Sequence, residues 1–315
     1  MTLLAGTNDG IYRLPSARFD EATQVLDCGR TMRVRQFGDE VYAASKTGLY
    51  RTTDGGSSWT NLGVPREEVY SVLVSPDGNR LYAGTHPAHL YLSENGGNSW
   101  RELTGFQDLP SREEWFTPRH RNEAHIRSLG AHPDEPNRVV AGVEVGGVHV
   151  SEDRGETWTE RREGVHDDVH HVLVCGPSEF LASCGDGLYR TSDAGETWER
   201  LDGALERRYF RESITHEGKI YAAASRSSPG SWQGESGADA ALYVSEKSGG
   251  EFSRMPYPGE PAEIVLAWAL AGGRLVAGTN AGQVIVLGDD GWETGGVVPK
   301  GIRSLCVGDS VSERI

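Results

Sequence analysis

Lysine, methionine and cysteine are scarce in this sequence, and long apolar runs are absent. Four of the 31 basic residues are lysines, and the 315 residues include three methionines and four cysteines. No apolar run is long enough to cross a bilayer as a helix, which excludes a helical membrane span. The four cysteines form no Cys-x-x-Cys pair and have no regular spacing. We therefore expect buried free thiols rather than a disulfide framework or a zinc site.

The N-terminal residues lack the basic segment, apolar stretch and cleavage-like site of a secretory signal. This pattern predicts a cytoplasmic protein without a membrane partner. The 46 acidic and 31 basic residues give a net charge of −15, which repels phosphate backbones and argues against a nucleic-acid partner. An acidic, lysine-poor composition is typical of halophilic proteins, and a GC-rich genome would produce the same lysine shortage, so both explanations stay open.

Glycine, in contrast, is abundant, with 41 residues, and one block of the type Gly-Leu-Tyr-Arg recurs seven times. Four of the six intervals between copies measure 38 to 42 residues, and the other two measure 58 and 54. A strand repeated at about 41 residues is typical of four-stranded propeller blades. The sequence therefore predicts an all-β fold, a seven-bladed β-propeller, with residues 1–315 as a single domain. The copies lie at residues 10–13, 48–51, 89–92, 147–150, 187–190, 241–244 and 283–286.

Small residues end the strand that precedes several of these copies. Residues 81–85 read Leu-Tyr-Ala-Gly-Thr, and residues 275–279 read Leu-Val-Ala-Gly-Thr. Since glycine and alanine project little or nothing beyond the backbone, we expect neighbouring sheets to approach closely at these positions, near the axis of the propeller.

An eight-residue turn follows the repeated strand in four good copies and one degenerate copy. In such a turn the Asp or Asn side chain accepts backbone N–H bonds, glycine supplies a positive φ and tryptophan fills the gap between blades. The good copies lie at residues 52–59, 93–100, 151–158 and 191–198, and the degenerate copy lies at 245–252, where Lys247 and Phe252 replace the Asp and the Trp.

These turns resemble the Asp-box (BNR) repeat, whose pattern is Ser/Thr-x-Asp-x-Gly-x-x-Trp. Propellers with this repeat include sialidases, sortilin-type receptor domains, xyloglucan-acting glycosidases and photosystem II assembly factors. The resemblance covers essentially the whole chain and implies the propeller fold, with Asp-boxes as structural turns, but no particular substrate. Sialidases use three arginines, a Tyr/Glu nucleophile pair and an Asp acid. No position of this chain matches those residues, so sialidase activity is not expected.

The ends of the chain carry complementary parts of one blade. The first unit begins at its second strand, residues 3–7, and lacks the inner strand that precedes it in other units. Residues 302–307 repeat the pattern of residues 126–129 almost letter for letter. We therefore predict that the C-terminal strand joins the N-terminal blade and closes the ring, which removes exposed sheet edges.

Two insertions are predicted to share one face of the propeller. Loops between blades and loops between the second and third strands of a blade emerge on the same face, which we call the insertion face. Residues 103–123 form an insertion of the first type and residues 226–239 one of the second type. Seven of the ten histidines map to this face: His86, His89, His120, His125, His166, His170 and His171.

These histidines and Glu144 support three alternative hypotheses. Imidazoles with one carboxylate suit a divalent Zn, Mn or Fe ion that activates water, with His86, His125, Glu144, His166 and His170 as ligands. Without a metal, His170 or His171 would act as a general base, with Glu144 as its partner or as an acid and His125 as a further catalytic candidate. The third hypothesis treats the histidines as solvated rim or buried structural residues. Because His170 and His171 are adjacent in a strand, only one is expected to face the pocket.

Arginines gather on the predicted inner strands and could bind a ligand. Guanidinium groups bind carboxylate or phosphate in a bidentate manner, so several that point into an axial pocket would select an anion. The alternative is that they pair with carboxylates such as Glu212. In the 103–123 insertion, Trp115 and Arg119 suit a lid or a sugar platform. The full set of expected ligand-binding residues is Arg33, Arg127, Arg211, Arg303, His86, His171, Trp115 and Arg119.

Three functions follow from these residues. The preferred hypothesis is a propeller that binds a small polar, anionic ligand, with hydrolase or lyase chemistry by Glu144 and a histidine. The alternative is a non-catalytic propeller that grips a protein partner, similar to the assembly factors. A further alternative is glycoside hydrolysis, which needs two carboxylates drawn from Glu123, Glu144, Asp167 and Asp168.

Overall fold

A computed structural model describes residues 2–15, 21–232, 237–246 and 250–308 of the chain. These residues form 28 β-strands and four short 3₁₀ helices. Within them, no helix has the length and apolar character needed to traverse a membrane. The degenerate Asp-box copy and the 226–239 insertion each lie partly outside the described residues.

The strands are β1 (Thr2–Thr7), β2 (Gly10–Pro15), β3 (Thr23–Leu26), β4 (Thr31–Phe37), β5 (Glu40–Ser45), β6 (Gly48–Thr52), β7 (Thr60–Asn61), β8 (Val69–Val74), β9 (Leu81–Thr85), β10 (Leu90–Ser93), β11 (Arg101–Glu102), β12 (His125–His132), β13 (Glu135–Glu144), β14 (Gly147–Ser151), β15 (Thr159–Glu160), β16 (Val169–Val174), β17 (Phe180–Cys184), β18 (Gly187–Thr191), β19 (Glu199–Arg200), β20 (Tyr209–His216), β21 (Lys219–Ser225), β22 (Ala241–Ser245), β23 (Phe252–Met255), β24 (Val265–Ala271), β25 (Arg274–Thr279), β26 (Gln283–Gly288), β27 (Gly291–Val297) and β28 (Ile302–Val307). The 3₁₀ helices are η1 (Thr104–Phe106), η2 (Arg112–Glu114), η3 (Pro118–His120) and η4 (Pro229–Ser231).

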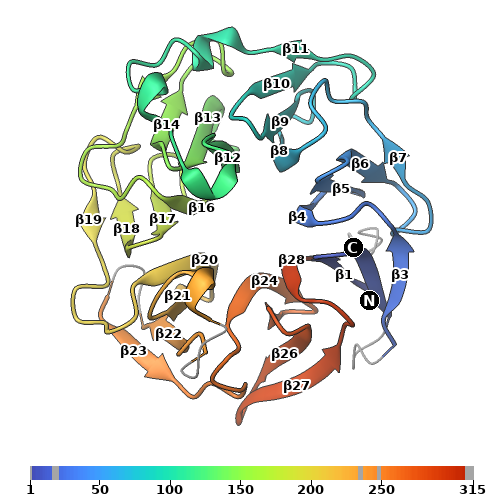
Figure 1. The fold of residues 1–315 in the computed structure, drawn as a ribbon, viewed down its shortest axis with the longest axis vertical. Coiled ribbons are helices and arrows are strands. Elements are labelled where there is room, and N and C mark those ends of the chain that lie inside the picture. The colour runs from blue at the N-terminus through green and yellow to red at the C-terminus, as the bar shows by residue number, and fades with distance from the viewer. Residues whose placement is uncertain (1, 16–20, 233–236, 247–249, 309–315) are drawn as a thin grey trace.

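Seven four-stranded antiparallel sheets stand around a central axis, as Figure 1 shows. The predicted seven-bladed β-propeller is confirmed. Its first blade has the strand order β28-β1-β2-β3, so the C-terminal strand is the innermost strand of the N-terminal blade. The register pairs Leu4 with Cys306 and Ala5 with Leu305, which confirms the predicted closure of the ring. Blades are numbered here from this one in chain order.

Neighbouring blades approach closely at the small residues of their second strands. An ideal Cβ on Gly84 would lie 2.7 Å from Ile126 Cγ2 in the next blade, and one on Gly278 would lie 2.5 Å from Ile302 Cγ2. Hydrophobic side chains fill the remaining space, and one core cluster runs between blades 3 and 4 and another between blades 2 and 3. The role expected for the small residues is therefore confirmed. The cysteines are free, and three of the four are buried.

The four good Asp-box turns share one hydrogen-bond pattern. In the copy of blade 5, the backbone N–H of Thr197 donates to Asp193 Oδ1 at 2.9 Å, and the N–H of Gly195 donates to Thr191 Oγ1 at 2.9 Å. The tryptophan of the same turn, Trp198, donates through Nε1 to the carbonyl of Arg161 in the preceding blade at 2.9 Å. Trp100 makes the same kind of bond to the carbonyl of Leu62, so the turns of blades 3 and 5 tie their blades to the preceding ones.

The inner strands share a β-bulge that determines the shape of the axis. In every blade the register between the first and second strands shifts at the same place, so one residue, or two in blade 6, lacks a direct partner. A bulge re-aims the extra side chain. One such residue from each blade, in blade 6 the first of the two, forms what we call the axial ring: Arg303, Met32, Tyr70, Arg127, His170, Arg211 and Leu266.

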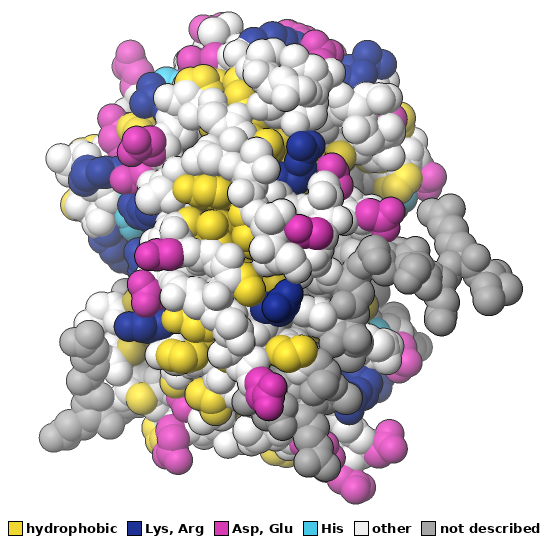
Figure 2. Space-filling model, turned by 90° about the vertical axis from the view of Figure 1, so that its right-hand side faces the viewer, with side chains coloured by type: hydrophobic (Ala, Val, Ile, Leu, Met, Phe, Trp, Pro, Cys, Tyr) yellow, Lys and Arg dark blue, Asp and Glu magenta, His cyan; other side chains and the backbone are white. Residues whose placement is uncertain are grey.

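The outer side of the ring carries a mixed surface. Figure 2 shows acidic, basic and hydrophobic side chains interspersed over the side that it presents, without a broad area of one charge. Arginines of the inner strands lie inside the channel, and the site is built from them.

Candidate functional site

Three cavities follow one another along the axis. A mouth of about 480 Å³ opens on the insertion face, a constriction of about 20 Å³ follows, and a lower chamber of about 230 Å³ lies beyond. The mouth and the constriction share Tyr70, Arg127 and Arg303, and the constriction and the lower chamber share Arg33 and Glu212. The constriction has room for roughly one water molecule. A ligand that enters through the mouth therefore ends at this constriction.

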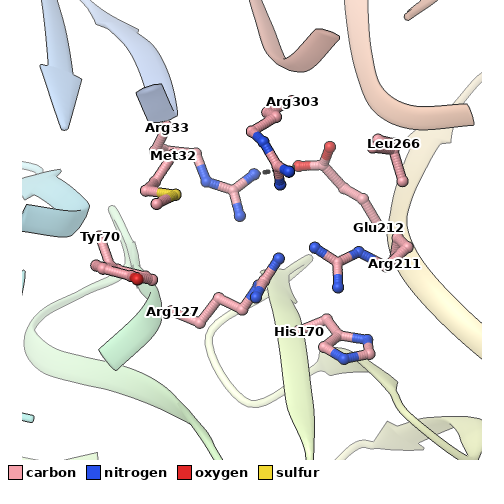
Figure 3. A pocket seen from close by; sticks show the side chains of 9 residues that line it. All are labelled: Met32, Arg33, Tyr70, Arg127, His170, Arg211, Glu212, Leu266 and Arg303. Atoms are coloured by element: carbon pink, nitrogen blue, oxygen red, sulfur yellow. Dashed lines mark hydrogen bonds and ion pairs between the residues drawn. The ribbon is translucent and has the colours of Figure 1, made fainter. Parts of the chain in front are cut away.

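All seven axial-ring side chains line the constriction, together with Arg33 and Glu212 (Figure 3). Arg33 Nη1 lies 2.5 Å from Glu212 Oε1, and this ion pair closes the channel toward the lower chamber. Arg211 donates to the hydroxyl of Tyr209 at 3.0 Å, and its guanidinium lies 5.8 Å from the centre of that ring. Arg211 thus keeps donors available for a ligand.

Positive charge exceeds negative charge along this part of the channel. Among the described residues, six arginines and two glutamates line the mouth and the constriction: Arg30, Arg33, Arg119, Arg127, Arg211 and Arg303, with Glu144 and Glu212. Burial, together with the neighbouring Arg30 and Arg127, lowers the pKa of Arg303 to about 9. The shift shows that an anion placed here would stabilise the charged form of the guanidinium.

Both insertions contribute to the mouth, which confirms that they share a face. Arg119 and His120 come from the 103–123 insertion, and Ser228, Pro229 and Trp232 come from the 226–239 insertion. Long loops that border a cavity are commonly functional in compact folds. The mouth is therefore shaped by the two segments in which this chain exceeds the regular blade length.

Glu144 lies at the centre of a group of titratable side chains beside the mouth. Its carboxylate forms an ion pair with Arg127. His120 Nε2 lies 3.4 Å from Oε1, and His125 Nε2 lies 3.3 Å from Oε2 without hydrogen-bond geometry. Burial opposes the charge on Glu144, but Arg127 and His125 hold the pKa of this carboxyl well below its usual range. Glu144 is therefore a permanently charged acceptor at neutral pH.

His125 and Asp168 have pKa values below their ordinary values. Burial lowers the pKa of His125 to about 4, although Glu144 acts in the opposite direction. Asp168 forms an isolated backbone bridge with Glu144. Burial works against its charge, yet its contacts with His170 outweigh burial and lower the pKa. The donor atoms of Glu144, Asp168 and His170 lie within 4.8 Å of one another, as do those of Glu144, His120 and His125.

Two of the predicted metal ligands lie outside these groups. The ring of His86 donates through Nε2 to the carbonyl of His120 at 2.9 Å, and its Nδ1 accepts from Arg121 at 2.7 Å. His166 Nδ1 accepts the backbone N–H of Asp168 at 3.1 Å, so its lone pair is used locally. The structure thus contradicts the placement of His86 and His166 in one set with Glu144, and it keeps His86 out of the residues that line the mouth.

Trp115 was also predicted incorrectly, because its side chain is part of the core. It is buried, its ring centre lies 5.3 Å from that of Phe106, and its Nε1 donates to Ser111 Oγ at 2.9 Å. A position inside a long loop suggested a platform, but the insertion folds back and seals the outer side of blade 4. Arg119, from the same insertion, does line the mouth.

His170 and His171 line different cavities, and the bulge of their strand determines which residue faces which cavity. The register shifts between Val169 and His171, so His170 lines the constriction. His171 lines the lower chamber, where its Nε2 lies 3.2 Å from Arg35 Nη2. Burial and the nearby Arg33 hold the pKa of His171 well below its usual range.

Sequence reasoning missed several residues of the mouth, among them Tyr70, Tyr209 and Arg30. Arg30 lies in a loop between blades, which was already assigned to the insertion face, so its position was available as a signal. Tyr70 and Tyr209 read as ordinary strand residues in the sequence. Tyr70 faces the axis through its bulge, and Tyr209 lies just before the bulge of its blade.

Comparison with known proteins agrees with this architecture. No protein-family model matches the chain. The photosystem II assembly lipoprotein Ycf48 of Synechococcus sp. (strain CC9902) is 23% identical over 255 residues, which cover 78% of this chain and 68% of that protein. A xyloglucanase of Paenibacillus sp is 28% identical over 142 residues, which cover 38% of this chain and 13% of the enzyme.

Solved structures with the same fold include YCF48 proteins and a GH74 enzyme. YCF48 from Cyanidioschyzon merolae superposes with a TM-score of 0.61 at 18% identity, covering 92% of this chain and 89% of that one. A YCF48 structure bound to a D1 peptide gives 0.56 at 16% identity, covering 83% and 80%. The chain has the fold of a seven-bladed β-propeller with Asp-box turns. The GH74 enzyme of Niastella koreensis gives 0.64 at 16% identity, covering 93% of this chain but 47% of that one.

This Asp-box propeller therefore spans about half the length of the GH74 enzyme and most of the length of the YCF48 chains. Its axis offers two kinds of chemistry. The arginine-lined mouth can bind an anionic group, and the carboxylates and imidazoles beside it can bind a cation.

Proposed function

We propose that this Asp-box propeller is a protein-interaction module that holds an acidic segment of a partner protein in the mouth of its axial channel. The observation that carries the proposal is the excess of arginine in the mouth and constriction, with six guanidinium groups against two carboxylates among the described lining residues. Carboxylate side chains of a partner would supply the missing negative charge through charge-assisted hydrogen bonds.

The size of the mouth supports a peptide rather than a whole domain as the group that enters it. A volume of about 480 Å³ falls within the range of small-ligand pockets, roughly 300–1,000 Å³, and so accepts a few side chains. Tyr70, Tyr209 and Trp232 give the mouth aromatic walls against which a peptide can pack. The rest of the partner would then rest on the two insertions.

The relatives support the same proposal. Ycf48 is a photosystem II assembly lipoprotein by name, and one YCF48 structure is bound to a D1 peptide. A YCF48 protein thus binds a peptide of a partner protein. We extend peptide binding to this chain because arginines line the mouth and the constriction of its channel.

Hydrolysis by Glu144 is less well supported. A general acid needs a pKa near the working pH, and the pKa of Glu144 lies well below its usual range because Arg127 neutralises the carboxylate. Asp168 also has a lowered pKa, so neither carboxyl of this pair holds a proton to donate at neutral pH. The Glu144–Asp168 pair therefore does not supply the proton donor that the glycoside hydrolase hypothesis needs.

Fluorescence anisotropy with a labelled peptide of alternating Glu and Gly residues tests the proposal. The wild-type chain should bind this peptide more tightly than the same peptide with Gln in place of Glu. Arg211→Gln and Arg303→Gln should each weaken binding by roughly tenfold, since a hydrogen bond to a charged group contributes about 1.5–3 kcal/mol.

Arg254→Gln provides the matched control, because Arg254 lies on the outermost strand of blade 6, away from the channel. It should leave the affinity unchanged. Equal affinity for the Glu and Gln peptides, or an equal effect of the channel and outer-strand substitutions, would show that the arginines of the mouth do not select the ligand.

A further inference from the structure

The ring nitrogens of His170 have different environments that determine its tautomer. Its Nδ1 lies 2.5 Å from the carbonyl oxygen of Phe210. Because a carbonyl only accepts hydrogen bonds, Nδ1 carries the hydrogen. In a neutral ring, Nε2 then holds a free lone pair. The side chain is 0% exposed, and Nε2 has no hydrogen-bond partner among the described residues.

Asp168 is the group that this lone pair faces. Its Oδ1 lies 3.4 Å from His170 Nε2, and it too is buried without a hydrogen-bond partner in the described part of the chain. Gly185 leaves room for the carboxylate, since a Cβ at position 185 would lie 2.3 Å from Asp168 Oδ2. Two lone pairs that face each other repel, so a proton or a metal cation is needed between them.

The distance favours a metal over a proton. An imidazolium that donates to a carboxylate approaches it to about 2.7–2.9 Å with good alignment. The observed 3.4 Å is longer and lacks hydrogen-bond geometry. Donor atoms about 2.0–2.2 Å from a tetrahedral zinc ion are separated by about 3.3–3.6 Å, which matches the spacing of His170 and Asp168.

Glu144 supplies a third ligand atom and adds a negative charge to the site. Its ligand oxygen lies within 4.8 Å of the donor atoms of both Asp168 and His170. Two carboxylates and the single guanidinium of Arg127, which pairs with Glu144, leave one net negative charge among these three groups. A dication offsets this charge, and the carbonyl of Phe210 orients the imidazole as an outer-shell partner does at metal sites.

We propose that Glu144, Asp168 and His170 form a binding site for a divalent transition metal of the zinc class, at the junction of blades 4 and 5. Glu144 lines the mouth and His170 the constriction, so the site lies beside the axial channel. The site stands on residues other than those tested for peptide binding, so either proposal can fail without the other.

Isothermal titration of the chelator-treated full chain with zinc sulfate tests this site, with cobalt(II) absorption as a second measurement. The wild-type chain should bind one ion, show visible cobalt d–d bands and melt at a higher temperature with zinc. Asp168→Asn and His170→Gln should each weaken zinc binding by more than about 100-fold, beyond the loss typical of an outer-shell substitution.

His89→Gln is the matched control, because His89 forms a similar pair with a carboxylate, Glu102, outside the channel. It should retain wild-type zinc affinity. Zinc binding that survives both Asp168→Asn and His170→Gln overturns the proposal. So does a wild-type chain that binds no zinc and whose ¹⁵N spectrum shows His170 with hydrogens on both ring nitrogens. That spectrum is recorded on the wild-type chain and so does not depend on the folding of a variant.

Discussion

His149 provides a sharp test of how burial governs the stability of this propeller. It lies on β14, is 0% exposed, and packs against Trp115 and Phe106 with ring centres 4.8 and 5.7 Å away. Its Nε2 donates to the carbonyl of Gly146 at 3.0 Å. Burial lowers the pKa of His149 from 6.5 to about 4. The folded protein therefore keeps this ring neutral under conditions in which the unfolded chain protonates it.

The sign of the pH dependence follows from this difference. Between pH 6.5 and 4 the unfolded state binds more protons at this site, so the contribution of His149 to stability is present above 6.5 and is lost as the pH falls. From pH 7 to pH 5 the loss amounts to about 2 kcal/mol. The pH stays above the range in which ordinary carboxyl groups titrate, which limits their contribution.

Urea unfolding at pH 7 and pH 5 measures the effect, with His149→Phe as the perturbation. Phenylalanine keeps an aromatic ring in the core but cannot take up a proton. The wild-type chain should lose about 2 kcal/mol more free energy of unfolding than the variant over this interval. The pKa values of His125 and His171 are also lowered, but these residues are present in both proteins and cancel. Equal pH dependence in the two proteins would refute the reasoning, and His132→Asn, at the end of β12, should behave as the wild type.

Three further predictions concern the packing of the blades and the charge of the mouth. Gly84→Ala should lower the free energy of unfolding, measured with urea, by about 1–3 kcal/mol. The new Cβ would lie 2.4 Å from Ser71 Oγ and 2.7 Å from Ile126 Cγ2. Gly203→Ala is the control and should be neutral, because a Cβ at position 203 meets no atom within 4 Å. Trp115→Ala should cost about 3–5 kcal/mol, as for a core residue, and a wild-type stability would place it on the surface instead. Raising the salt concentration should weaken binding of the Glu peptide, because partly exposed charges are screened, and a salt-independent affinity would argue against the arginines as its binding groups.

The architecture could be predicted from the sequence because its determinants are local and repeated. The Asp-box turn is stabilised by its own residues, as the hydrogen bond from Thr197 to Asp193 shows, so each copy marks the end of a blade. Ring closure could be predicted from the sequence because Ser304 and Ser128 occupy equivalent positions of their strands and make the same contact. Each serine side chain bonds the backbone of an inner strand in the next blade, at Val34 and Val172 respectively.

The candidate site was predictable only in part. The sequence places Glu144 and His170 in the right blades, and the structure brings their donor atoms within 4.8 Å of each other. The errors at His86 and Trp115 have a different origin. Both residues were assigned from the face on which their loop emerges, but a loop that folds back can bury its side chains, as Ser111 and Phe106 of the same insertion do with Trp115.

The β-bulge explains why the alternation of side chains along a strand did not predict which residues face the axis. Alternation along a strand assigns every second side chain to one face, but one extra residue in each inner strand resets that alternation beside the axis. The repeat itself reveals the position, because each inner strand has the bulged residue directly after a hydrophobic or β-branched one, as in Ile126-Arg127 and Ile302-Arg303. Four consecutive blades, 3 to 6, contribute polar members: Tyr70, Arg127, His170 and Arg211. Blades 7 and 2 contribute Leu266 and Met32. Arg303 of blade 1 lies between these two apolar members, so the ring presents guanidinium groups from blades 1, 4 and 6, and a bound segment would direct charged groups toward both sides of the axis.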